Sequence, residues 1–355
     1  MSEIRTLTLE EAAKSATDLR KMVSEVIFGQ EDLVTETLCA LIAGGHILMT
    51  GAPGLAKTTL VKVFSRHLGL KFGRVQFTPD LLPSDIVGSD VLNIDKTSGN
   101  RQFEFSPGPV FVNLLLADEI NRASPRTQSA LLEAMQERSV TVGGKLHPLP
   151  EPFMVFATQN PYEFEGTFPL PEAQIDRFLL HTLVSYPDSA AEEKLLKEHV
   201  ENRLIGELIA KDQEALKISE AAAGKNLDAA LVAAMIRRAK DLRVDEELIV
   251  AIKELVRSTR PEDELCPEEF RGAIWYGASP RAGISLVSVS RAFALLSGSE
   301  IVRWKHIRRL VKPVFRHRIK IKVRAAQELG SEDRLIEHLL ERLESRYKNL
   351  AKGLS

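Results

Sequence analysis

Residues 51–58 of the chain read GAPGLAKT and lie between an apolar run and an amphipathic stretch. The preceding run, His46–Thr50, has the composition of a buried strand, and Lys57–Leu68 has the pattern of a helix. A strand, a glycine-containing turn and a helix in this order form the context of a phosphate-binding loop. Backbone amides of the turn and the positive end of the helix can cradle a polyphosphate. This unit predicts an α/β fold for the first part of the chain.

One position departs from the general phosphate-loop pattern, because Ala56 stands where a second glycine is usual. An alanine fits there if its φ angle is negative. In this interpretation Lys57 reaches the β- and γ-phosphates and the Thr58 hydroxyl is a ligand of Mg²⁺. The alternative from the loop alone is a strand-to-helix turn without a ligand. The residues here that we expect to contact a nucleotide are Gly51, Ala52, Pro53, Gly54, Leu55, Ala56, Lys57, Thr58 and Thr59.

Two carboxylates end a second apolar run about sixty residues further on. Leu114–Ala117 is followed by Asp118 and Glu119, and a strand end places both at the edge of a sheet. By itself such a pair is usually a solvated strand terminus. Together with a phosphate loop, Asp118 is suited to hold Mg²⁺, and Glu119 is suited to orient and deprotonate a water molecule.

The rest of the first half alternates apolar runs with amphipathic stretches, which is typical of a parallel sheet flanked by helices. The run before Asp118 belongs to a buried strand that is expected at Val110–Ala117. Further buried strands are expected at Phe153–Thr158 and Phe178–Val184. Ser124 and Pro125 have the residue types of a helix start, and this helix should end near Arg138.

Length and composition predict a second domain. A chain of 355 residues exceeds the roughly 250–300 residues that one core supports. After Pro187 nearly every segment has the pattern of an amphipathic helix, so we expect an α/β domain over 1–187 and an all-helical domain over 188–355. Within the first, Thr78–Pro109 and Ser139–Leu149 have the character of insertions, the latter around a Gly143-Gly144 hairpin turn.

Charge and hydropathy argue against several classes of protein. Lys and Arg number 47 against 49 Asp and Glu, a net charge of −2, which removes the general electrostatic case for nucleic acid. A local basic run, Arg303–Arg324, could contact acidic partners, neighbouring subunits or nucleic acid, although no aromatic platform accompanies it. No apolar run reaches the ~18 residues of a membrane helix, and the first twenty residues lack a signal-peptide core. We therefore expect a cytoplasmic protein without a membrane span.

Taken together, these motifs resemble those of the AAA+ ATPases, and their detailed residue pattern resembles that of the MoxR family. The segments that carry the resemblance extend over about two-thirds of the chain in the family's order. They are Gly51–Thr58 (GAPGLAKT), Ala117–Ala123 (ADEINRA), Thr127–Glu137 (TQSALLEAMQE), Ala157–Pro161 (ATQNP), Leu170–Phe178 (LPEAQIDRF) and Ala278–Ala282 (ASPRA). The resemblance implies a P-loop α/β core with a C-terminal helical lid that binds ATP and Mg²⁺. An alanine at position 56 is of the kind this family tolerates.

The resemblance also assigns roles residue by residue. Asn160 is similar to the sensor-1 polar residue, Arg177 to an arginine finger that enters the neighbouring subunit's site, and Arg281 to the sensor-2 arginine of the lid. Each could instead be an ordinary turn-capping or ion-paired side chain. The segment similar to the family's adenine-pocket lining contains Phe28, Gly29 and Gln30, and it could equally be plain core.

The same resemblance implies how the protein works. The two insertions correspond to a helix-2 insert and a hairpin before sensor 1, which face the ring pore or a client. An arginine finger requires a homo-oligomeric ring, which we expect to be a hexamer. Its work would be chaperone-like remodelling, maturation or metal insertion of a client, together with a partner that has a von Willebrand factor A domain. The alternatives are a nucleic-acid-dependent motor, disfavoured by the net charge, and a nucleotide-switched binding module, disfavoured by Glu119.

Overall fold

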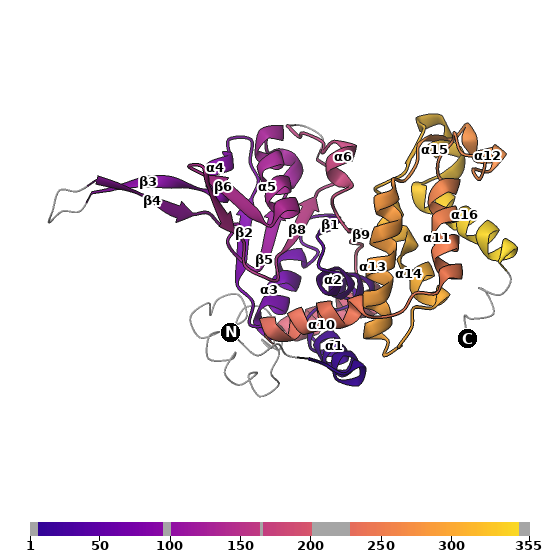
Figure 1. The fold of residues 1–355 in the computed structure, drawn as a ribbon, viewed down its shortest axis with the longest axis horizontal. Helices are drawn as coiled ribbons and strands as arrows, with labels where there is room; N and C mark the ends of the chain where they lie inside the picture. The colour runs from indigo at the N-terminus through magenta and orange to yellow at the C-terminus, as the bar shows by residue number, and fades with distance from the viewer. Residues whose placement is uncertain (1–5, 95–100, 164–165, 201–227, 348–355) are drawn as a thin grey trace.

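A computed structural model describes residues 6–94, 101–163, 166–200 and 228–347 of the chain. It contains an α/β part and a helical part that lie side by side (Figure 1). Within these residues, none of the helices combines the length and the apolar character needed to cross a bilayer.

Five parallel strands form the central sheet, in the order β2-β5-β8-β1-β9. Four of them, β1, β5, β8 and β9, match the expected apolar runs, whereas β2 was not expected from the sequence. The strands are β1 (Ile47–Thr50), β2 (Phe72–Gln76), β5 (Leu114–Asp118), β8 (Met154–Gln159) and β9 (Leu180–Leu183). An α/β fold with a parallel sheet is thereby confirmed.

Helices cover both faces of the sheet because alternate residues of its buried strands point to opposite sides. Leu114 and Leu116 of β5 pack into a core with α2 and α3, while Leu115 and Ala117 pack into a second core with α5. The flanking helices are α1 (Leu9–Ser24), α2 (Glu31–Ala43), α3 (Lys57–His67), α5 (Pro125–Glu137) and the short η1 (Ile120–Arg122) and α6 (Glu172–Ile175). As expected, Ser124 caps α5, and Arg138 follows its last residue.

Both insertions are formed, and they pack against each other. The first contains α4 (Pro83–Val87), β3 (Gly88–Ile94) and β4 (Arg101–Pro107); the second is the hairpin β6 (Ser139–Val142) and β7 (Lys145–Pro148). Their contact includes a stack of the Phe105 and His147 rings, whose centroids lie 3.8 Å apart. Figure 1 shows the β3–β4 hairpin extending away from the sheet, on the side opposite to the helical part.

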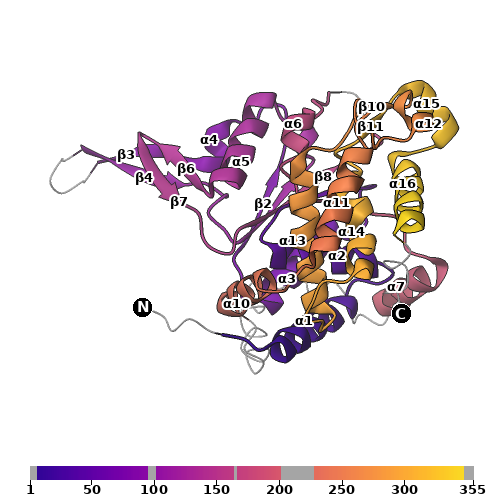
Figure 2. The ribbon, with the colours of Figure 1, turned by 45° about the vertical axis from the view of Figure 1, so that its right-hand side comes forward.

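The elements after β9 are taken together as the helical part, which contains only two short strands among its described residues. Its elements are α7 (Ser189–Val200), α10 (Ala229–Lys240), α11 (Glu246–Ser258), α12 (Glu268–Arg271), β10 (Ile274–Tyr276), α13 (Pro280–Leu296), α14 (Trp304–Phe315), β11 (Lys320–Ile321), α15 (Val323–Leu329) and α16 (Glu332–Arg346). In both views α10 lies beside α1 of the α/β part (Figures 1 and 2).

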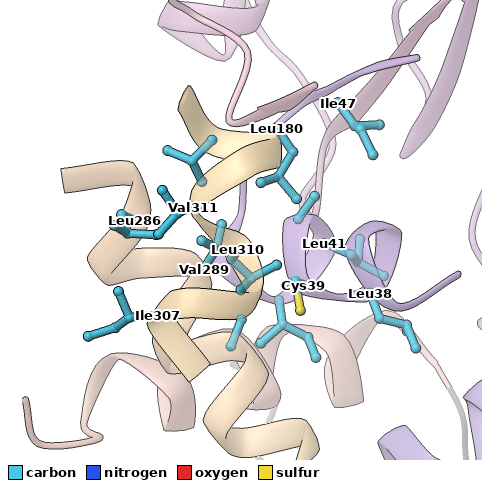
Figure 3. Close-up of a cluster of buried hydrophobic side chains, with 14 of the residues drawn as sticks. Leu38, Cys39, Leu41, Ile47, Leu180, Leu286, Val289, Ile307, Leu310 and Val311 are labelled. Atoms are coloured by element: carbon cyan, nitrogen blue, oxygen red, sulfur yellow. The ribbon is translucent and has the colours of Figure 1, made fainter. Parts of the chain in front are cut away.

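One hydrophobic core continues from the sheet into the helical part. Leu38 and Leu41 of α2 share this core with Leu286 of α13 and with Leu310 of α14 (Figure 3). Helix α13 packs on α2 as well as on α14. The helical part is therefore fixed to the α/β part through α13, and the division of the chain at Pro187 stays a prediction.

Five of the ten basic residues in the basic run Arg303–Arg324 are ion-paired with acidic residues of the same chain. Arg308 and Lys312 pair with Glu337 of α16, and Arg316 pairs with Asp333 at 2.8 Å. Other members of the run reach the α/β part: Arg309 pairs with Asp32 and Glu36, and Arg318 pairs with Asp176. These ion pairs hold α14 and the residues that follow it to α16 on one side and to α2 and the end of α6 on the other.

Candidate active site

The glycine-containing loop connects the carboxyl end of β1 to the first turn of α3. Gly51 passes close to β9, where an added Cβ would lie 2.5 Å from the carbonyl oxygen of Val184, so a side chain does not fit there. Gly54 turns the loop with a φ of +82°. The loop consequently lies at the carboxyl edge of the sheet, with its amides next to the start of α3.

The conformation of Ala56 differs from the expectation. Its φ is +55°, in the left-handed region, whereas a negative φ was the condition for an alanine at this position. Ala56 is the N-cap of α3, and the chain has to turn there to enter the helix. The Cβ of an L-residue in this region costs about 1–2 kcal/mol. The loop thus keeps the shape that glycine would give it, at the expense of backbone strain.

Asp118 and Glu119 meet the loop across a cavity of about 340 Å³. Asp118 is the last residue of β5, and Glu119 follows it with a φ of +55°. A hydroxyl from the neighbouring strand fixes both: Thr158 Oγ1 donates to Asp118 Oδ1 at 2.6 Å and accepts from the Glu119 amide at 2.8 Å. The cavity lining includes Pro53, Gly54, Leu55, Ala56, Lys57, Thr58, Thr59, Asp118, Glu119 and Asn160.

Lys57 is half-buried in this cavity. Its Nζ donates to the carbonyl oxygens of Gly51 and Ala52, at 2.6 and 3.1 Å. Burial lowers the pKa of Lys57, while the charges of Asp118 and Glu119 act in the opposite direction. The ammonium group therefore lies over the loop, with two carboxylates on the far side of the cavity.

Two further cavity residues, Arg74 and Gln76, come from β2, the strand that the sequence analysis missed. Arg74 Nη2 donates to Asp118 Oδ2 at 2.7 Å, and Gln76 Nε2 donates to Glu119 Oε2 at 2.7 Å. Arg122 of η1 donates to the same Glu119 oxygen at 3.2 Å. The alternation of polar Arg74 and Gln76 with apolar Val75 and Phe77 was the signal that could have found this strand.

Asn160 follows β8 and lies at the edge of the same cavity. Its Oδ1 accepts from the Tyr162 amide at 3.1 Å, and its Nδ2 donates to Glu163 Oε1 at 2.8 Å. Asn160 is thus a turn-capping residue that also lines the cavity, and the two descriptions do not exclude each other.

The segment Phe28–Gln30 lies outside the cavity lining. It packs against the chain that leaves β9: Gln30 Nε2 donates to the Ser185 carbonyl at 2.6 Å, and an added Cβ on Gly29 would lie 2.7 Å from Ala191. Lys194 of α7 lies over the Phe28 ring at 4.2 Å from its centroid. The segment therefore joins α7 to the α/β part.

Arg177 and Arg281 lie together in a second cavity of about 300 Å³, apart from the phosphate loop. Arg177 follows α6, and Arg281 is in the first turn of α13. Arg138, Arg318 and Asp176, which the sequence analysis did not assign to a site, line this arginine cavity as well. The expected site residues thus divide into two groups, one around the loop and one around the arginines.

Comparison with known proteins identifies the class. A model of the ATPase family associated with various cellular activities (AAA) matches residues 46–180, and a model of the AAA lid domain matches residues 270–339. The first span contains the loop, both carboxylates and Arg177, and the second contains Arg281. Fold and site therefore define an AAA+ ATPase.

Comparison with individual proteins identifies the family within this class. The chain is 38% identical over 319 residues to the chaperone MoxR1 of Mycobacterium tuberculosis, covering 90% of this chain and 79% of the relative. It is 32% identical over 312 residues to the protein MoxR of Paracoccus denitrificans, covering 85% and 87%. A crystal structure from Cytophaga hutchinsonii, described as a candidate ATPase, matches with a TM-score of 0.78 and 35% identity over 94% of this chain and 96% of that one. The chain belongs to the MoxR family of AAA+ ATPases.

Proposed function

We propose that the chain hydrolyses ATP with Mg²⁺ in the cavity of the phosphate loop. The observation that supports this most is the meeting of Asp118, Glu119 and Lys57 with the loop amides in one cavity. A switch that only binds nucleotide has no need for Glu119, whereas hydrolysis requires a group that orients and deprotonates water. Glu119 is held for this role by Gln76, Arg122 and the strand-end geometry of β5.

Each side chain has a separate role in this proposal. Lys57 would leave the loop carbonyls to bind the β- and γ-phosphates, which are charged and therefore stronger acceptors. The Thr58 hydroxyl and the Asp118 carboxylate are oxygen donors, and such donors fit Mg²⁺. Bound there, the metal would neutralise charge on the phosphates. Asn160 would orient the attacking water. The Phe28–Gln30 segment would lie near the adenine base of the bound ATP.

Two substitutions test these separate roles. Lys57→Ala should weaken ATP binding by about tenfold or more, since a charged hydrogen bond is worth about 1.5–3 kcal/mol. Glu119→Gln should bind ATP with an affinity within about twofold of the native chain but hydrolyse it at least ~10²-fold more slowly. Glu133→Gln, an exposed glutamate on α5, is the matched control and should leave both quantities unchanged. Equal losses of ATP affinity in the Lys57 and Glu119 variants would contradict the proposal.

Arg177 and Arg281 would act on the ATP of a neighbouring subunit in a homo-oligomeric ring. What supports this is their placement in the arginine cavity, apart from the chain's own phosphate loop. Guanidinium groups stabilise the charge that spreads over a transferring phosphoryl group. A hexamer is the ring size we propose, as the family resemblance implies.

A mixing experiment tests the ring. Arg177→Ala subunits keep their phosphate loop, and Lys57→Ala subunits keep their arginines, so each is inactive alone. At mixed interfaces an intact arginine meets an intact loop, and turnover should partly return. Gel filtration must first show that both variants assemble. Verified mixed rings without any recovery, over a range of ratios, would exclude action between subunits.

We further propose chaperone-like remodelling as the work that hydrolysis drives, either maturation of a client protein or metal insertion into it. One relative is named a chaperone. The β3–β4 and β6–β7 hairpins extend from the α/β part as one packed unit, and Leu146 at the second is 68% exposed. Such a surface suits contact with a client, and a protein with a von Willebrand factor A domain is the partner that we propose.

A further inference from the structure

The carboxylate of Asp176 joins the two segments that carry the arginines of the arginine cavity. Its Oδ2 accepts a hydrogen bond from Ser279 Oγ at 3.0 Å, and its Oδ1 accepts one from Arg318 Nε at 2.7 Å. Asp176 directly precedes Arg177 in the chain. Ser279 is the N-cap of α13 and stands two residues before Arg281. The Asp176 side chain thus links the segment that carries Arg177 to the segment that carries Arg281.

Arg318 completes this junction from the end of α14. It is 4% exposed, and its Nη2 donates to the carbonyl oxygens of Asp176 and Phe178, at 3.1 and 2.6 Å. The same nitrogen donates to Ser285 Oγ on α13 at 3.2 Å. The guanidinium group therefore binds the chain on both sides of Arg177 and also the helix that carries Arg281.

Stability alone is a weak reason for such a junction. Burying an ion pair costs about as much desolvation energy as the attraction returns, and apolar replacements are often as stable. The effect that an apolar contact could not reproduce is directional: hydrogen bonds fix the positions of the segments on either side. Arg177 and Arg281 carry like charges and have long side chains, so their convergence in one cavity requires such fixed backbone positions.

We propose that Asp176 is a positioning residue, which holds Arg177 and Arg281 at the spacing needed to contact one phosphate group of a neighbouring subunit together. This inference rests on the proposed function, because it presupposes that both arginines act across the ring interface. The ligand that the two arginines share is a nucleoside triphosphate bound to the adjacent phosphate loop.

The same helix offers a matched control. Arg316 of the α14 end pairs with Asp333 through two hydrogen bonds, Nε to Oδ1 at 3.0 Å and Nη2 to Oδ2 at 2.8 Å. This pair joins α14 to α16, and neither residue lines the arginine cavity. Asp333→Asn consequently removes the same charge from a comparable ion pair without loosening the Asp176 junction.

The first measurement compares Asp176→Asn with Asp333→Asn in the full chain. Asp176→Asn should keep the ATP dissociation constant within about twofold and lower the turnover rate about tenfold or more, since small misplacements of catalytic groups are costly. Asp333→Asn should change both by less than about twofold. In an Arg177→Ala, Arg281→Ala background, Asp176→Asn should have no further effect, because both groups that it positions are already missing. An additive loss, or an equal loss in Asp333→Asn, would overturn the proposal.

Mixing separates a positioning role from general damage. Asp176→Asn subunits retain their own phosphate loop, so mixing with Lys57→Ala subunits should restore turnover as it does for Arg177→Ala. If mixing with Lys57→Ala subunits restored turnover for Arg177→Ala but not for Asp176→Asn, the positioning role of Asp176 alone would be overturned. Recovery with neither, in verified mixed rings, would overturn the action between subunits on which it rests.

If Asp176→Asn does not fold, Ser279→Ala tests the same junction more gently. It removes the hydrogen bond to Asp176 Oδ2 and the cap hydrogen bond from the Arg281 amide, and it leaves the Arg318 pair in place. We expect a loss of turnover of about tenfold, the scale of one hydrogen bond to a charged carboxylate, which disappears in an Arg177→Ala, Arg281→Ala background. A loss that persists undiminished in that background would show that Ser279 acts only as a helix cap.

Discussion

Three residues other than glycine adopt left-handed backbone conformations in the described part of the chain, and all line one of the two cavities. Ala56 and Glu119 line the cavity of the phosphate loop, and Arg138 lines the arginine cavity. Strained backbone of this kind persists where the surrounding structure fixes it, often at functional sites. For Ala56 the strain has a measurable consequence.

Replacing Ala56 by glycine should stabilise the chain. The substitution removes about 1–2 kcal/mol of strain in the native state. Glycine also makes the unfolded chain more flexible, which returns about 0.5–1 kcal/mol, so the net gain in the free energy of unfolding should be about 0.5–1 kcal/mol. Thermal unfolding without nucleotide should show a small rise in Tm.

Gly54→Ala is the opposite test in the same loop. Gly54 has a φ of +82° and nothing within 4 Å of an added Cβ, so the substitution introduces backbone strain without a clash. It should lower the free energy of unfolding by about 1 kcal/mol. If Ala56→Gly and Gly54→Ala shifted Tm in the same direction, backbone conformation would not be the cause.

Among the elements, those with strong local signals were predicted from the sequence. The apolar runs of β1, β5, β8 and β9 identified four strands, because strands of a parallel sheet are buried on both faces. The Ser124-Pro125 pair located the start of α5, and the Gly143-Gly144 pair located the β6–β7 turn. In each case a few adjacent residues determine the local structure.

Elements whose role depends on distant contacts were missed. Strand β2 lies at the edge of the sheet, and its exposed Arg74 and Gln76 interrupt the apolar run that marks the other strands. Their function comes from pairing with β5, which brings them to Asp118 and Glu119. Likewise, Asp176 and Arg318 are 142 positions apart, so no local pattern indicates their contact. The loop and its carboxylates could be predicted, whereas the side chains that hold them could not.

On the scale of the whole molecule, the structure changes the interpretation of the basic run. As a sequence, Arg303–Arg324 could be a surface for nucleic acid. In the structure Arg308, Arg316 and Arg318 are each paired with a carboxylate of another element. Charges neutralised in this way release few counterions from a polynucleotide, and counterion release supplies most of its non-specific affinity. The paired members of the run therefore serve to assemble the helical part.

From this we predict that polynucleotides do not stimulate the ATPase. At moderate salt, single- or double-stranded DNA should change ATP turnover by less than about twofold, because the remaining weak contacts are screened. Two of the exposed members of the run, Lys322 and Arg324, provide the control: replacing both by glutamine should leave turnover with and without DNA unchanged. A motor would behave differently, since repeated phosphate contacts make stimulation fall steeply with salt. A tenfold or larger stimulation that weakened with salt and disappeared in the Lys322→Gln, Arg324→Gln variant would replace the remodelling proposal with a nucleic-acid motor.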